Sequence, residues 1–164
     1  MKIYFAADHA GFEIKNELMN FVRGELGHEV EDCGAYQLDT NDDYPSIIAV
    51  AARALVDDAH KGFQSRAIIA GGSGQGEAMA ANRFRGVRCA VYYGEAARKQ
   101  TDMSGKEIDI LVSPREHQNA NCLSLGLRFL TLDEAKSAVK KWLETEYPCE
   151  ERHARRIEAL DTLD

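Results

Sequence analysis

Several features of secreted, membrane and metal-binding proteins are missing from this sequence. The four cysteines, Cys33, Cys89, Cys122 and Cys149, lie far apart, without a C-x-x-C pair or a histidine at zinc-ligand spacing. No apolar run approaches the roughly 18 residues that a membrane helix needs, and the first apolar stretch ends at Asp8, too soon for a signal peptide. We therefore expect a reduced cytoplasmic protein without a disulfide framework or a metal site.

Positive charge is in deficit, with 20 Lys and Arg against 27 Asp and Glu and a net charge of −7. This charge repels nucleic acid and anionic membranes, so neither is an expected partner, and an anionic ligand would need a local basic cluster. Proline is scarce, at 3 residues, whereas 45% of the 164 residues are apolar. This length and composition predict one globular domain over residues 1–164.

Short apolar runs alternate with helical patterns along the chain. The runs predict buried strands at residues 3–7, 29–34, 67–70, 87–93 and 121–130. Apolar residues at helical spacing predict helices around residues 14–22, 45–56, 77–83 and 132–143, and a charged helical tail within 150–163. This alternation predicts an α/β fold with a five-stranded parallel sheet covered by helices on both faces, whereas the charged stretch 95–116 has no assignable pattern.

The loop after the third strand is the most informative local feature, with four glycines within Gly71–Gly76. Together with the loop 8–11, it should lie at the C-terminal edge of the sheet, where such folds bind ligands. Closely spaced glycines let backbone N–H groups approach an anion or an oxyanion, and the alternative is a tight turn without a ligand. It is not a P-loop, because Glu77 and Ala78 replace the required Lys and Ser or Thr. Glu77 either complements the dipole of the next helix or acts as a base.

Seven segments, taken in order, resemble one protein family. They are Ala7–Phe12, Asp43–Pro45, Gly72–Gly76, Ala80–Arg83, His117–Asn121, Leu125–Gly126 and Arg152–Arg156. The family is the ribose-5-phosphate isomerase B and galactose-6-phosphate isomerase group, and the resemblance covers nearly the whole chain. It implies a Rossmann-like three-layer α/β/α sandwich that forms a homodimer, or alternatively a tetramer, with active sites between subunits. The tail 148–164 would pack at that interface, and the implied reaction needs no metal, nucleotide or other cofactor.

The resemblance also implies catalytic roles for individual residues. Asp8 and His117 correspond to the pair that opens the sugar ring, and Glu77 to the base that moves a proton between C1 and C2. Many members use a cysteine base at the position of Gly71, so this sequence resembles the branch with a glutamate base. The enediolate oxygen would be bound by Ser73 and by the N–H groups of Gly72 and Gly74.

The remaining implied residues contact the substrate. Those near the sugar are Tyr44, Gly76 and Gln118, and those that bind the phosphate are His9, Arg128, Arg152 and Arg156. Gln118 stands where the family usually has Asn. Arg152 and Arg156 are four residues apart, so on a helix they would share one face and grip one phosphate. From the residues alone, other readings stay open: Asp8 as a helix cap, His117 as a solvated histidine, and the arginines as a salt-bridged exposed face.

The resemblance implies an aldose–ketose isomerase of a phosphorylated sugar, with ribose 5-phosphate and ribulose 5-phosphate as the first choice. The alternatives are an isomerase of a hexose 6-phosphate of the allose or galactose type, and a sugar-phosphate binding module without catalysis. The stretch Lys99–Asp109 is extra sequence compared with ordinary members. It would either reshape substrate selection or lengthen the subunit contact.

Overall fold

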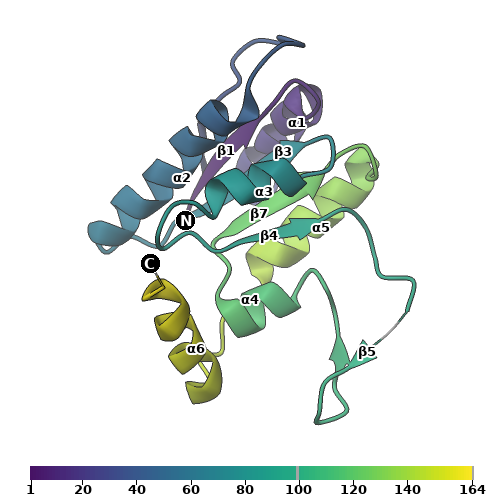
Figure 1. The fold of residues 1–164 in the computed structure, drawn as a ribbon. Coiled ribbons are helices and arrows are strands. Elements are labelled where there is room, and N and C mark those ends of the chain that lie inside the picture. Colours follow the sequence, from purple (N-terminus) through teal and green to yellow (C-terminus); the bar gives the residue numbers. More distant parts are fainter. Residues whose placement is uncertain (99, 164) are drawn as a thin grey trace.

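Five parallel strands form the central sheet of the protein, in the order β2-β1-β3-β7-β4 (Figure 1). The computed structural model describes residues 1–98 and 100–163, so Lys99 and Asp164, the ends of the extra stretch and of the tail, lie outside the described residues. The strands are β1 Lys2–Ala7, β2 Glu29–Asp32, β3 Arg66–Gly71, β4 Cys89–Tyr92 and β7 Cys122–Gly126. The five-stranded parallel sheet is therefore confirmed.

Helices cover both faces of this sheet and complete a three-layer α/β/α sandwich. One face carries α1 Phe12–Gly24 and α5 Leu132–Glu144, and the other carries α2 Tyr44–His60 and α3 Gln75–Ala81. In β1, Phe5 packs toward α1 and α5, whereas Tyr4 and Ala6 pack toward α2. Because successive strand residues face opposite sides, burial of both faces explains the continuous apolar run.

Local signals in the sequence set the helix ends near the functional edge. Pro45 lies in the first turn of α2, where its missing N–H costs no hydrogen bond. At α5, Thr131 and Glu134 form a reciprocal capping box.

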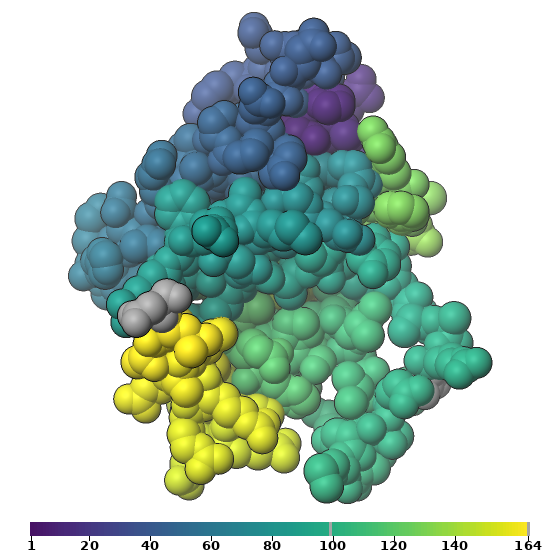
Figure 2. Space-filling model, in the orientation of Figure 1, coloured from purple at the N-terminus to yellow at the C-terminus, as the bar shows by residue number. Residues whose placement is uncertain are grey.

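The charged stretch without a sequence pattern forms a hairpin and a short helix. The hairpin pairs β5 Gln100–Thr101 with β6 Glu107–Ile108, and α4 Ser113–Gln118 follows it. In Figure 2 the hairpin stands away from the body of the molecule. Strands this short, exposed on most sides, have no core-facing alternation that a sequence pattern could reveal.

The tail forms α6 Glu151–Asp161, as predicted, and packs beside α4 at the end of the sheet where the strands begin. At the same end of the sheet, polar contacts join β3 to the end of α5. Arg66, at the start of β3, donates hydrogen bonds to the carbonyl oxygens of Trp142 and Leu143 at 3.0 and 2.8 Å. Over the described part of the chain, there is no helix with the length and hydropathy needed to cross a bilayer.

Candidate active site

The chain leaves β1 toward β2 on one side and returns to β3 on the other, so the loops that follow β1 and β3 lie at the switch point of the strand order, where such folds bind ligands. The loop after β1 begins against the neighbouring strand, since the Asp8 N–H donates to the carbonyl of Ala70 in β3 at 3.3 Å. Asp8 is buried, and its Oδ1 accepts hydrogen bonds from the N–H groups of Ala10 and Gly11 at 2.9 and 3.2 Å. These bonds fix its carboxylate at the end of β1.

Backbone packing accounts for some of the glycines in the loop after β3. Gly74 has φ +73° and precedes α3, and a Cβ there would lie 2.9 Å from the Leu125 carbonyl carbon. The Ser124 hydroxyl donates to the Gly74 carbonyl at 2.6 Å, which locks the loop to β7. The loop is therefore held tightly against β7.

Glu77 fills the space that a side chain at position 71 would occupy. A Cβ added to Gly71 would fall on the Glu77 carboxylate itself. Glycine at 71 and glutamate at 77 are therefore coupled by steric exclusion, which is the pairing that the glutamate-base branch implied. The carboxylate is held at the end of β3, next to the glycine loop.

The environment of Glu77 favours its neutral form more than water would. The side chain is only 5% exposed. Burial raises the pKa of Glu77, and the nearby carboxylates of Asp8 and Asp42 raise this pKa further. A carboxyl group with a raised pKa is suited to take up and return a proton near neutral pH.

Three further predicted residues lie on or beside the glycine loop. The Tyr44 ring lies over Gly76, where an added Cβ would meet its hydroxyl oxygen at 2.8 Å. The Arg128 guanidinium lies beside Gly72, and the backbone N–H of Arg128 donates to the Gly72 carbonyl at 3.1 Å. The Ser73 hydroxyl lies on the same loop, 3.4 Å from the Gln75 nitrogen.

His9 completes this half of the site and contacts a residue that the sequence analysis missed. Its Nδ1 lies 2.7 Å from Oδ1 of Asp42. This hydrogen bond, with the negative charge of Asp8, raises the pKa of His9, while Arg128 opposes the change. The acidic loop 37–43 gave no sequence signal that would have singled out Asp42.

Asp8, His9 and Asp42 bring three potential ligand atoms within 4.8 Å of one another. Their hydrogen bonds argue against a metal centre, because Asp42 Oδ1 engages His9 and Asp8 Oδ1 accepts two backbone N–H groups. The positive Arg128 is close enough to lower the pKa of His9, so it would also disfavour a cation here. We read the group as a hydrogen-bonded network.

The other predicted site residues lie at the opposite end of the same chain's sheet. His117 and Gln118 end α4, which leads into the start of β7, whereas the glycine loop packs against the end of β7. Five strand residues, at about 3.3 Å each, separate the two ends. Arg152 and Arg156 lie on α6, beside α4. Within one chain, these four residues do not join Glu77.

The second group is organised around a histidine stack. The rings of His117 and His153 are 4.4 Å apart and nearly parallel, at 12°. His117 Nδ1 lies 3.1 Å from the Ser113 hydroxyl, and Arg152 Nε lies 3.1 Å from His153 Nε2. Burial, with the positive Arg152 nearby, lowers the pKa of His153. The sequence analysis assigned His153 no role, yet it supports both His117 and Arg152.

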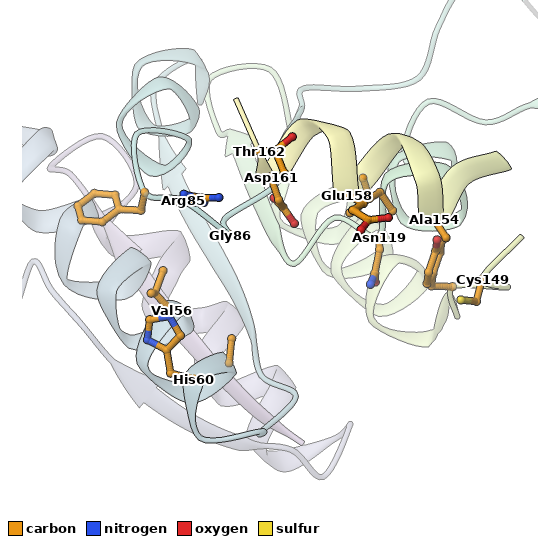
Figure 3. Close-up of a pocket in the computed structure, with 14 residues that line it drawn as sticks. Val56, His60, Arg85, Gly86, Asn119, Cys149, Ala154, Glu158, Asp161 and Thr162 are labelled. Carbon is orange, nitrogen blue, oxygen red and sulfur yellow. The ribbon is translucent and has the colours of Figure 1, made fainter. Parts of the chain in front are cut away.

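A large cleft of about 810 Å³ lies away from Glu77, between the end of α2, the loop after α3 and the helix α6 (Figure 3). His60 and Arg85 line one wall, and Glu158 and Asp161 project from α6 on the other. None of the predicted site residues lines it.

The chain is similar in sequence and in fold to several known proteins. The profile of the family described as Ribose/Galactose Isomerase matches residues 3–160. Ribose-5-phosphate isomerase B of Mycobacterium tuberculosis is 37% identical over 161 residues, which cover 98% of this chain and 88% of that protein. The structure of ribose-5-phosphate isomerase B from Clostridium thermocellum matches with a TM-score of 0.80 and 32% identity, covering 98% of this chain and 95% of that one. The enzyme from Mycoplasma genitalium, with bound ribulose-5-phosphate, matches with a TM-score of 0.80 and 28% identity, covering 98% and 93%.

Proposed function

This chain belongs to the ribose/galactose isomerase family, and on that premise we propose that it interconverts ribose 5-phosphate and ribulose 5-phosphate. It is an aldose–ketose isomerase of a phosphorylated sugar. The observation that carries the chemistry is the buried carboxylate of Glu77, which lies against Gly71 with a raised pKa. A binding module without catalysis would need cations but no such carboxylate.

The proton relay runs through Glu77. Its carboxylate takes the proton from C2 of the open aldose, and the electrons of the broken C–H bond form the enediolate. Glu77 then returns the proton to C1, while the proton of the C2 hydroxyl passes to the C1 oxygen, so that C2 becomes the ketone and C1 carries a hydroxyl. Ser73 and the N–H groups of Gly72 and Gly74 stabilise the developing negative charge on oxygen. Neither a metal nor another cofactor is part of this proposal.

Ring opening needs a second pair of groups, Asp8 and His117. Asp8 holds the sugar hydroxyls, and His117 exchanges a proton with the ring oxygen, because an imidazole can both donate and accept a proton. Phosphate binding is divided between His9 and Arg128 at one end of the sheet and the α6 arginines, Arg152 and Arg156, at the other. Tyr44, Gly76 and Gln118 complete the contacts to the sugar.

A second copy of this chain supplies the distant half of the site in this proposal, so that the active unit is a homodimer. Apolar side chains on α3 and on the loops after β4 and β7 are exposed, as expected for a surface that a partner covers: Met79 at 69%, Phe129 at 63% and Tyr93 at 50%. All four thiols are free in the structure, which supports a reducing compartment such as the cytoplasm.

The variant E77Q tests the assigned base. It keeps the shape of the side chain but cannot accept the proton, so kcat should fall by roughly 10²-fold or more while ribulose 5-phosphate still binds. The measurement is isomerisation kinetics together with ligand binding. The matched control is E13Q, in the exposed first turn of α1, which should keep wild-type kcat. Normal turnover by E77Q would remove Glu77 as the base.

A panel of sugar phosphates tests the substrate. We expect the highest kcat/KM for ribose 5-phosphate, and lower values for the 6-phosphates of allose and galactose. A preference for a hexose 6-phosphate would overturn the pentose assignment and leave the isomerase class intact.

A further inference from the structure

Asp42 is a nearly buried carboxylate for which the proposed reaction has no step. Its side chain is 9% exposed and lies at the end of the acidic loop before α2. A turn directs it inward, because the Asp42 N–H donates to the Asp39 carbonyl at 3.2 Å and the Asn41 N–H donates to Asp39 Oδ1 at 2.9 Å. Asp43, the next residue, is exposed instead.

The hydrogen bonds of Asp42 are asymmetric. Oδ1 lies 2.7 Å from Nδ1 of His9, whereas Oδ2 is buried without a hydrogen-bond partner among the described residues. A buried carboxylate with a single neutral donor would leave most of its charge unsatisfied, which is costly. An imidazolium at His9 provides the opposite charge, so the contact is stable as an ion pair.

The groups around His9 agree with this interpretation. The loop after β1 contributes Asp8, the loop before α2 contributes Asp42, and the loop after β7 contributes Arg128. The two carboxylates favour the protonated ring and the arginine opposes it, with the bond to Asp42 as the largest influence. With Nδ1 directed at Asp42, the other ring nitrogen is left to bind an anion.

We propose that Asp42 is a positioning residue that keeps His9 oriented and protonated, so that His9 binds the substrate phosphate as a cation at a higher pH than it would without Asp42. The proposal rests on the proposed function for the identity of the anion, but the His9–Asp42 pair can be tested without turnover. Arg128 then acts beside a second positive group instead of alone.

The variant D42N separates charge from shape, because the amide oxygen can still accept the His9 hydrogen bond. Removing the negative charge lowers the pKa of His9, so the variant loses the cation at a lower pH than the wild type does. The KM for ribose 5-phosphate should match the wild type at pH 6 and be about 10-fold higher at pH 8, with kcat changing less than KM. A merely structural role would raise KM equally at both pH values, and that result would overturn the proposal.

Two controls make the outcome specific. D43N removes the charge of Asp43, the exposed N-cap residue of α2, whose side chain makes no capping hydrogen bond. This variant should leave the pH dependence of KM unchanged. In an H9N background, D42N should add no further pH dependence, since the group that it controls is gone.

The titration of His9 by NMR tests the pair independently of activity. The pKa of His9 should be lower in D42N than in the wild type, in the presence and absence of inorganic phosphate. Equal pKa values would refute the proposal. If the wild-type protein does not isomerise ribose 5-phosphate, the proposed function fails, while this titration still decides whether Asp42 controls His9.

Discussion

At the scale of single residues, the contact between Gly71 and Glu77 predicts the effect of one methyl group. In G71A the new Cβ would fall on the Glu77 carboxylate, which must move or force the loop to move. Because a displacement of about 1 Å can cost about 10² in rate, kcat should fall by 10- to 100-fold. Steady-state kinetics measures this. The control G24A adds a methyl where nothing lies within 4 Å, and an equal loss in both variants would contradict the steric account.

Sequence patterns located this residue-scale chemistry only in part. The order Gly71, Gly72, Ser73 and Glu77 predicted a glutamate beside a glycine loop, and the structure places them together. Asp42 could not be found in this way, because one carboxylate in an acidic loop looks like its neighbours until a turn directs it inward. The roles assigned to these side chains remain predictions.

At the scale of elements, the short helix α4 depends on a buried arginine. Arg115 donates hydrogen bonds to Ala120 O and Asn119 Oδ1 at 2.6 and 2.9 Å and lies over the Trp142 ring. Burial, with Arg66 and Arg88 nearby, lowers its pKa to about 10. R115A would leave the buried carbonyl without its donor and should lower the free energy of unfolding by about 3 kcal/mol.

Urea denaturation measures this loss. The matched control, R155A on the exposed side of α6, should change the free energy of unfolding by less than about 0.5 kcal/mol. If R115A were equally harmless, the polar contacts of α4 would not be what holds His117 in place.

Elements that face the core were predictable, whereas the exposed hairpin of β5 and β6 and the short helix α4 were missed. The strand β1 and the helix α5 show clear apolar patterns because their burial imposes a period. The hairpin of β5 and β6 is held by exposed ion pairs, such as Lys106 with Glu116 and Lys141 with Asp109. Charged pairs of this kind do not produce the periodic spacing of apolar residues from which helices and strands are predicted.

At the scale of the whole molecule, the proposed division of the site between two chains can be tested by mixing. E77Q and H117A should each be inactive as homodimers. A mixed dimer has one site with both substitutions and one site with neither, so co-expression with random pairing should restore about one quarter of wild-type activity. Kinetics of the co-purified chains measures this, and no recovery would place both residues in one subunit's site.

The sequence reveals this arrangement only in part. His117 directly precedes the predicted strand 121–130, which favours the edge where the strands begin, but no spacing locates Arg156 relative to the sheet. Only the position of α4 and α6 at the start of the strands separates them from Glu77. The family resemblance supplied the idea of a shared site, and the observed separation of the two groups supports it.

The placement of Glu77 and His117 at opposite ends of the sheet has a consequence for how the protein behaves at low concentration. A lone chain would carry the proton relay without its ring-opening partner, so turnover per chain would not be constant on dilution. It would fall once the protein drops below the dissociation constant of the pair, and substrate that bridges both chains would slow the decline. Catalytic output would then report the association equilibrium itself.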